Sequence, residues 1–230
     1  MNIDRFDPNH AYASHEGTIL AADVVPPGMH APFLHAYGYL LNNRCMAGHA
    51  HATDEIYIVT SGSGYVAVGG RIKQVKAGDI VMIPPNVYHT MLCTDHDEAP
   101  YTWAALWWDH IDGAEPFGDE IVVKRFDPKT AQSGHNGTLL ADAVVTENLK
   151  TPFGHAFGYL TKGQTMEEHA HPTEEMYVVL SGTGEMMVDG EVKTVTAGDV
   201  IGIPANAQHW FTAASDELLW AAFWWDVAEE

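Results

Sequence analysis

An internal repeat is the feature that most constrains the fold of this 230-residue chain. Residues of the same type recur 120 positions apart, most densely in a stretch rich in histidine. The first copy has His49, His51, Glu55, Gly62, Gly78, Pro84, Asn86 and His89. The second copy has His169, His171, Glu175, Gly182, Gly198, Pro204, Asn206 and His209. A repeat of this length predicts two similar domains, each large enough to bury its own core.

The repeat extends well upstream of the histidines. The tetrapeptide RFDP at residues 5–8 recurs at residues 125–128. Between the two units, residues 111–119 have the glycine, proline and acidic content of a connector. We therefore expect an N-terminal domain over residues 1–118 and a C-terminal domain over residues 119–230.

Short apolar stretches separated by turn residues make up most of each unit. Glycine-containing turns are expected at residues 69–70, 77–79, 189–190 and 197–199, and little of the chain has helical periodicity. This pattern predicts an all-β chain of antiparallel strands whose sheets are closed or packed face to face.

The histidine stretch has the spacing of a metal site. His49 and His51 point to the same face of a strand because side chains alternate along it. Three imidazole nitrogens and one carboxylate oxygen suit Fe, Mn, Ni, Co, Zn or Cu and leave coordination positions open for water or substrate. We predict two divalent transition metal ions per chain, lost as pH falls through the range in which free imidazoles protonate, about 6 to 7. The predicted ligands are His49, His51, Glu55 and His89 in the first half, and His169, His171, Glu175 and His209 in the second.

The spacing of these residues resembles the cupin family. The first cupin motif, G-x5-H-x-H-x3-E-x6-G, is complete from Gly163 to Gly182, whereas Asn43 replaces its leading glycine in the first half. In the second motif, Asn86 and Asn206 replace a glycine, and asparagine tolerates the left-handed backbone better than most residues. The resemblance spans nearly the whole chain and implies a bicupin: two tandem jelly-roll β-barrels, each with a metal at its His-His-Glu-His set.

An aromatic strand precedes each histidine stretch. Phe33, His35, Tyr37 and Tyr39 share one face, and the second copy repeats this alternation with His155 in place of His35. We expect this face to line the barrel interior, either as core or as a wall that contacts substrate. In the second case His35 and His155 are candidate catalytic residues.

Glu167 is a further catalytic candidate in the second half. Its position has the parity of His169 and His171, so on a regular strand its carboxylate points toward the metal, where burial raises its pKa for proton transfer. Ala47 occupies the matching position of the first half, which predicts unequal sites. The alternative is that Glu167 lies at a strand start, in solvent. The remaining histidines, expected at the surface, are His10, His15, His30, His96, His110 and His135.

Charge and apolar patterning exclude several partners. With 11 Lys and Arg against 31 Asp and Glu, the formal net charge of −20 repels nucleic acids and anionic membranes. No apolar stretch reaches the roughly 18 residues of a membrane span, and the first residues lack the apolar segment of a signal peptide. We expect a cytoplasmic protein with free thiols at Cys45 and Cys93, a small-molecule substrate, and neither a nucleic acid nor a membrane partner. A homodimer remains open.

Three functions fit these features. The first is a metal-dependent enzyme, similar to the quercetin and diketone dioxygenases of the cupin family, that acts on a small neutral substrate through an enol, hydroxyl or carbonyl oxygen. The second is a non-redox isomerase, lyase or hydrolase whose metal is a Lewis acid. The third is a small-molecule binding protein without turnover. The strand positions expected to face the metal include no Lys or Arg to hold a phosphate or a second carboxylate, which disfavours sugar-phosphate isomerases and oxalate decarboxylases. We favour the enzyme that resembles the dioxygenases.

Overall fold

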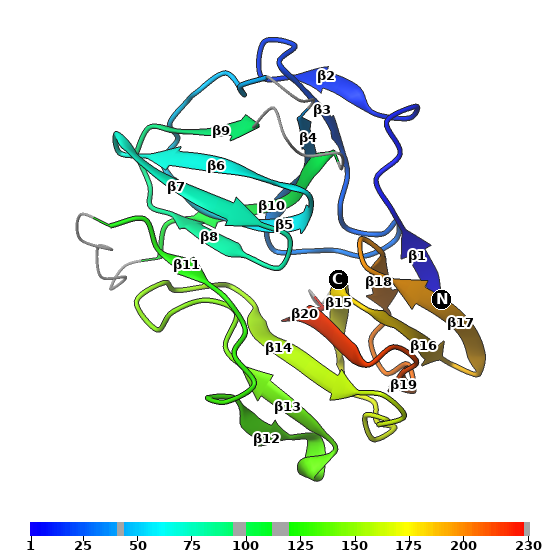
Figure 1. Cartoon of the computed structure of the whole chain (residues 1–230). Helices are drawn as coiled ribbons and strands as arrows, with labels where there is room; N and C mark the ends of the chain where they lie inside the picture. Colours follow the sequence, from blue (N-terminus) through cyan, green and yellow to red (C-terminus); the bar gives the residue numbers. More distant parts are fainter. Residues whose placement is uncertain (41–43, 94–99, 112–119, 228–230) are drawn as a thin grey trace.

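The computed structural model describes residues 1–40, 44–93, 100–111 and 120–227. This part of the chain is all β apart from one short 3-10 turn, η1 (His135–Gly137), and it forms two barrels (Figure 1). None of its helical segments has the length and apolar character needed to cross a membrane. The predicted all-β fold with tandem barrels is therefore confirmed.

The first barrel packs a seven-stranded sheet, in the order β11-β8-β5-β10-β4-β3-β2, against a three-stranded sheet, β7-β6-β9. All neighbouring strands in both sheets are antiparallel. The strands are β2 (Tyr12–Ser14), β3 (Ile19–Ala22), β4 (Leu34–Leu40), β5 (Thr53–Ser61), β6 (Ser63–Val68), β7 (Arg71–Lys76), β8 (Ile80–Ile83), β9 (His89–Cys93), β10 (Tyr101–Asp109) and β11 (Val123–Lys124).

The second barrel repeats this arrangement, with the sheets β1-β18-β15-β20-β14-β13-β12 and β17-β16-β19. Its strands are β1 (Asn2–Asp4), β12 (Gln132–Gly134), β13 (Leu139–Asp142), β14 (Gly154–Thr161), β15 (Thr173–Ser181), β16 (Thr183–Val188), β17 (Glu191–Thr196), β18 (Val200–Ile203), β19 (His209–Ala213) and β20 (Glu217–Asp226).

The two halves exchange their opening strands. β1 pairs with β18 of the second barrel, with Ile3 opposite Ile201, and β11 pairs with β8 of the first barrel, with Val123 opposite Val81. Figure 1 shows β1, at the start of the chain, beside β18. Each large sheet is thus completed by the segment that opens the other half. The predicted boundary between residues 118 and 119 lies outside the described residues.

Two ion pairs fasten the exchanged segments. The Arg125 guanidinium donates from Nε to Oδ1 of Asp79 and from its terminal nitrogen to Oδ2, both at 2.6 Å. Arg5 makes the equivalent contact with Asp199, but its Nε, at 2.8 Å, and its terminal nitrogen, at 2.7 Å, both meet Oδ1. The arginine of each RFDP segment therefore binds the aspartate of a glycine turn in the other half.

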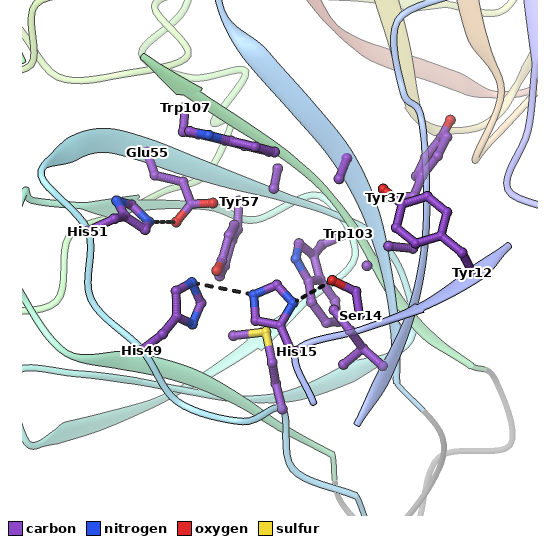
Figure 2. Close-up of a pocket in the computed structure, with 16 residues that line it drawn as sticks. Tyr12, Ser14, His15, Tyr37, His49, His51, Glu55, Tyr57, Trp103 and Trp107 are labelled. Atoms are coloured by element: carbon purple, nitrogen blue, oxygen red, sulfur yellow. Dashed lines mark hydrogen bonds and ion pairs between the residues drawn. The ribbon is translucent and has the colours of Figure 1, made fainter. Parts of the chain in front are cut away.

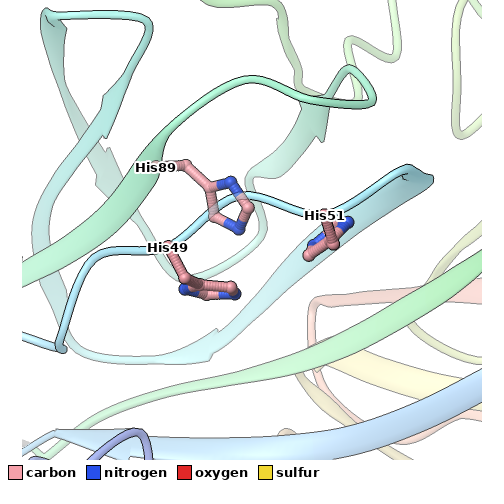
Figure 3. A group of neighbouring side chains, drawn as sticks. All are labelled: His49, His51 and His89. Carbon is pink, nitrogen blue, oxygen red and sulfur yellow. The ribbon is translucent and has the colours of Figure 1, made fainter.

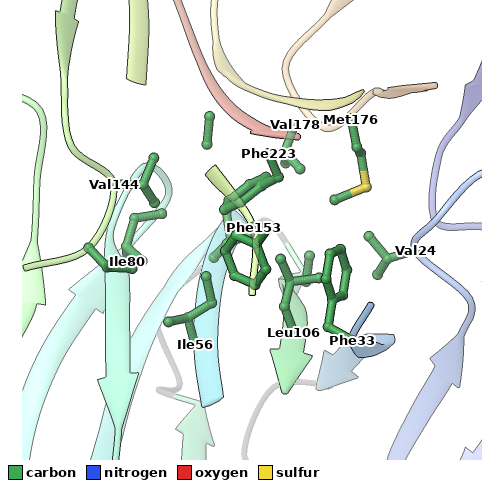
Figure 4. Close-up of a cluster of buried hydrophobic side chains, with 14 of the residues drawn as sticks. Val24, Phe33, Ile56, Ile80, Leu106, Val144, Phe153, Met176, Val178 and Phe223 are labelled. Atoms are coloured by element: carbon green, nitrogen blue, oxygen red, sulfur yellow. The ribbon is translucent and has the colours of Figure 1, made fainter. Parts of the chain in front are cut away.

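The aromatic strand faces the other barrel and not the barrel interior, so that prediction was wrong. Tyr37 of β4 and Phe33, which precedes β4, belong to a core cluster of residues from both halves, in which the ring centres of Phe33 and Phe153 lie 5.0 Å apart (Figure 4). The alternate positions face inward, and Leu40 belongs to the core of the first barrel. Because the barrels cover each other, both faces of β4 are apolar, and alternation alone does not reveal which one is the interior.

A glycine on the inward face of β4 makes room for a tryptophan. A Cβ at Gly38 would overlap the ring of Trp103, which is buried across the sheet on β10. Gly158 and Trp220 repeat this contact in the second barrel. The glycine thereby lets a full indole fill the barrel next to the histidine stretch.

Candidate metal centres

Three histidines converge in the first barrel. His49 precedes β5, and His89 lies at the start of β9. Their backbones form a two-way hydrogen-bonded bridge with N···O distances of 3.1 and 2.9 Å. His51 projects toward the same point two residues after His49 (Figure 3). One ligand atom of each ring lies within 4.8 Å of the others, which brings together the three predicted imidazoles.

The second barrel repeats this cluster. His169 and His209 form the same two-way bridge, with distances of 3.1 and 2.9 Å, and His171 completes a triad within the same 4.8 Å limit. The two predicted histidine sets therefore form two separate sites, one per barrel.

A buried carboxylate lies against each triad. Oε2 of Glu55 is 3.0 Å from Nε2 of His51 and 3.2 Å from Nε2 of His89. Oε2 of Glu175 lies at 3.1 and 3.4 Å from the matching atoms of His171 and His209. Burial pushes the pKa of Glu55 upward, but the hydrogen bond from His51 and the close approach of the His89 ring outweigh burial and hold that pKa below its usual 4.5. The carboxylate is therefore charged, as a metal ligand must be.

The fixed orientation of the buried rings fits a cation. Nδ1 of His89 donates to the Val87 carbonyl at 2.9 Å, and Nδ1 of His209 donates to the Ala207 carbonyl at 3.0 Å. Each Nε2 is then left as a lone pair that faces the site, and in both residues it is buried without a hydrogen-bond partner. A buried lone pair next to a carboxylate is costly unless a cation lies between them, so the donor set matches a divalent metal.

The asparagines in the second motif have the backbone expected of them. Asn86 and Asn206 have φ of 61° and 63°, in the left-handed region. Their N–H groups donate to the carbonyls of His51 and His171 at 2.6 and 2.7 Å. The asparagine thus turns the chain and anchors the second histidine of each triad. Asn43, the other substituted glycine position, lies outside the described residues.

An apolar pocket of about 340 Å³ opens onto the first site (Figure 2). Several residues that line this pocket were not predicted from the sequence, among them Tyr12, Trp107 and Tyr57. Burial raises the pKa of Tyr57 well above its ordinary value of 10, and the neighbouring Glu55 carboxylate adds to this shift. Tyr57 is therefore neutral and holds a proton next to that carboxylate. It lies two residues after Glu55 on the same strand face, which is a signal that alternation supplies.

A fourth histidine lies beside each triad, where the sequence reasoning expected surface residues. Nε2 of His15 is 3.4 Å from Nε2 of His49, and His15 is half-buried in the pocket wall, so its surface prediction was wrong. His135 is exposed as expected, yet its ring lies 4.5 Å from that of His169. The exposed positions of the other described histidines, His10, His30 and His110, match the prediction. His96 lies outside the described residues.

The three catalytic candidates lie away from the triads or in solvent. His35 is on the face of β4 that turns from the barrel interior, and its Nδ1 accepts hydrogen bonds from the N–H groups of Val24 and Val25. His155 accepts one from Val144 in the same way. Burial lowers the pKa of both histidines.

The expected burial of Glu167 was wrong. Its side chain is exposed, and its carboxylate accepts a hydrogen bond from Asn136 at 2.6 Å. The buried side chain at this point is that of Met166, because the chain before β15 makes isolated bridges and does not continue as a regular strand. A catalytic role for Glu167 stays a prediction.

Comparison with known proteins agrees with this fold and its sites. The cupin domain family matches the chain twice, over residues 46–106 and 157–225, which cover both triads. The chain belongs to the cupin family. With a complete histidine triad in each of two barrels, it is a bicupin.

Among curated proteins, the bicupin is 41% identical over 114 residues to the acireductone dioxygenase of Acidiphilium cryptum. This alignment covers 47% of the bicupin and 61% of the relative. A second acireductone dioxygenase, from Gluconacetobacter diazotrophicus, is 37% identical over 84 residues, which cover 35% of the bicupin and 44% of that relative. The chain therefore spans only part of the length of the curated relatives that it matches.

Solved structures share the fold of the whole bicupin. The salicylate 1,2-dioxygenase of Pseudoaminobacter salicylatoxidans superposes with a TM-score of 0.70 at 14% identity, covering 94% of the bicupin and 76% of that chain. Bacillus subtilis oxalate decarboxylase, which has Mn(II) centres, superposes with a TM-score of 0.63 at 15% identity, covering 100% and 78% of the two chains. At these identities the likeness establishes the two-barrel fold alone.

Metal binding near neutral pH should release protons from the sites. The hydrogen bond to Glu55 raises the pKa of His51 above its ordinary value of 6.5, so a metal ion must displace a proton from His51 near that pH. Burial lowers the pKa of His49 to about 4, so His49 competes for protons only in more acidic solution. Metal affinity should therefore rise with pH until His51 is neutral.

Calorimetry of Zn²⁺ binding at pH 6.5, in buffers of different ionisation enthalpy, measures this release. We expect about one proton per site from the second histidine of each triad. Binding that releases no proton at this pH would contradict the assignment of His51 and His171 as ligands.

Proposed function

We propose that this bicupin is a metal-dependent oxygenase that acts on a small neutral substrate through an enol, hydroxyl or carbonyl oxygen. The observation that carries the proposal is the pocket over the first triad. It is lined mainly by apolar and aromatic side chains, and its described lining contains three histidines and one carboxylate but no Lys or Arg. Such a pocket has no cation to bind a phosphate or a second carboxylate, so it favours an uncharged substrate with one polar end.

The residues of the pocket have separable roles. His49, His51, Glu55 and His89 would hold the metal, which supplies Lewis-acid and redox chemistry to a substrate oxygen when bound. Trp103 and Trp107 on β10 form an aromatic wall that keeps water from the substrate. The neutral Tyr57 hydroxyl orients the Glu55 carboxylate. The curated relatives support oxygen chemistry, because both of those compared above are acireductone dioxygenases.

Oxygen consumption by the metal-loaded chain tests this proposal. Metal-free protein is reloaded separately with Fe²⁺, Ni²⁺, Mn²⁺, Co²⁺, Cu²⁺ or Zn²⁺ and given enediols, β-diketones and flavonols in an oxygen electrode. We expect oxygen uptake matched to substrate loss with at least one redox-active metal and none with Zn²⁺. The metal-free chain is the control.

Two other results would replace the proposal. Substrate loss without oxygen uptake, as fast with Zn²⁺ as with Fe²⁺, would assign the bicupin to Lewis-acid isomerases, lyases or hydrolases. A ligand that binds and is recovered unchanged with every metal would make it a binding protein.

A further inference from the structure

His15 has the position of an additional metal ligand in the first barrel. Its Nε2 faces Nε2 of His49 at 3.4 Å, and Figure 2 shows the ring between His49 and Ser14 among the residues that line the pocket. Two nitrogen atoms that each lie about 2.1 Å from one metal ion are roughly 3.0–3.4 Å apart in octahedral to tetrahedral geometry. The observed separation therefore fits two ligands of a shared ion.

The other ring nitrogen of His15 is already engaged. Nδ1 lies 3.1 Å from the Ser14 hydroxyl, which can accept its proton and leave the Nε2 lone pair facing the pocket. With Nε2 of His49 also unprotonated, as a metal ligand must be, the two lone pairs would repel at this distance, and a cation between them would remove the repulsion.

The backbone that presents this histidine is unusual and is built twice. His15, Glu16 and Gly17 have φ of 49°, 59° and 78°, and His135, Asn136 and Gly137 have φ of 44°, 55° and 89°. Non-glycine residues rarely adopt this conformation, which costs of order 1 kcal/mol or more for each residue. Because the same strained turn occurs at the equivalent place in both barrels, we infer that it serves to position the histidine side chain.

A threonine fixes each turn to its metal site. The Thr18 hydroxyl donates to the His15 carbonyl and accepts the N–H of Ala47, two residues before His49. In the second barrel Thr138 makes the same two contacts, with the His135 carbonyl and the N–H of Glu167. The turn is thus hydrogen-bonded, through this threonine, to the segment that carries the first histidine of the triad.

We propose that His15 and His135 each supply a fourth imidazole to the metal of their barrel. This inference rests on the metal-dependent function proposed above and narrows its substrate class. Three histidines and one glutamate leave two positions open on a six-coordinate metal, and a fourth imidazole fills one of them. The remaining position admits a substrate bound through a single oxygen atom, so the resting site selects monodentate ligands over chelating ones.

The variants His15→Asn and His135→Asn test the proposal on the full chain. Asparagine tolerates the left-handed backbone, but its side chain is too short to reach the metal. His10→Asn, at an exposed histidine of the first half, is the matched control. Affinity for Co²⁺ is measured by competition with a chromophoric chelator, and the Co²⁺ absorption bands are recorded, because they report coordination number.

We expect each variant to weaken one of the two Co²⁺ sites by about 10-fold or more and to change its absorption bands, while His10→Asn changes neither. The effect should be larger for His15, because Ser14 orients its ring whereas Gly134 has no side chain to do so for His135. Pulsed EPR of the Cu²⁺-loaded wild-type chain should detect four coupled imidazoles per site, a measurement that needs no variant.

Unchanged Co²⁺ affinity and spectra in the double variant, or three imidazoles per Cu²⁺, would overturn the proposal, even if turnover fell. These readouts involve no turnover. They therefore test the assignment of His15 and His135 as ligands separately from the oxygenase proposal. Failure of the oxygenase proposal would appear as a wild-type chain that consumes no oxygen with any substrate.

Discussion

Replacing His89 with alanine should reduce the metal content of the reloaded chain from two ions to one. His89 is fully buried, its Nδ1 is committed to a backbone carbonyl, and its Nε2 has no hydrogen-bond partner. Without it the triad keeps only His49 and His51, beside Glu55 and the proposed ligand His15, and affinity there should fall at least 100-fold, roughly the upper end of what loss of a supporting partner alone costs. Elemental analysis after reloading and dialysis measures this change.

The symmetry of the chain provides the controls for this experiment. His209→Ala should empty the second site and leave the first, and the double variant should bind no metal tightly. His30→Ala, at an exposed histidine, should retain two ions. Two tightly bound ions in the His89→Ala chain, with its fold verified by circular dichroism, would show that His89 is not a ligand.

Replacing Arg125 with alanine should destabilise the chain by about 3 kcal/mol, because it leaves a buried carboxylate without its charged partner. Asp79 is fully buried, and Arg125 contacts both of its oxygens at 2.6 Å. After the substitution the N–H of Lys76, at 3.0 Å, still donates to the Asp79 side chain, but no charge there replaces the guanidinium. Chemical denaturation, followed by tryptophan fluorescence, measures the free energy of unfolding.

The equivalent ion pair, between Arg5 and Asp199, provides a comparison for the expected loss of stability. Arg5→Ala should cost about 1.5 kcal/mol, because Arg5 contacts one oxygen of Asp199 and that residue is less completely buried. Arg125→Lys keeps the charge but loses the two-pronged contact and should fall between wild type and Arg125→Ala. If Arg125→Ala lowers the free energy of unfolding no more than Arg5→Ala does, the burial of Asp79 does not determine how much the Arg125–Asp79 ion pair stabilises the chain.

Local spacing made the metal residues predictable. His49, His51 and Glu55 lie within seven consecutive positions, and a 120-residue repeat showed which distant histidine accompanies them. The substituted asparagines were predictable for a similar reason, because the left-handed backbone at Asn86 is a local property of its turn. Features fixed by a few neighbouring residues were thus within reach of the sequence.

Features fixed by the packing of one barrel on the other were not. Alternation showed that β4 has an aromatic face. This face is buried because the second barrel packs against it, and the sequence of β4 alone does not reveal that contact. The fourth histidine was missed because the left-handed turn at His15 has no periodicity that points a side chain inward. A weaker signal was present: His-x-Gly-Thr at residues 15–18 recurs at residues 135–138, at the spacing of the whole repeat.

The strand exchange has a consequence for synthesis of the chain from its N-terminus. When the first barrel has left the ribosome, the outer edge of β8 has no partner until residues 123–124 follow, so an incomplete chain presents an open sheet edge to other molecules. The delay between synthesis and pairing is far longer for β1, because its partner β18 begins at Val200. β1 is therefore made before the first barrel but is among the last strands of the two barrels to pair, and nascent chains arrested between the two halves should aggregate more readily than chains that contain both halves.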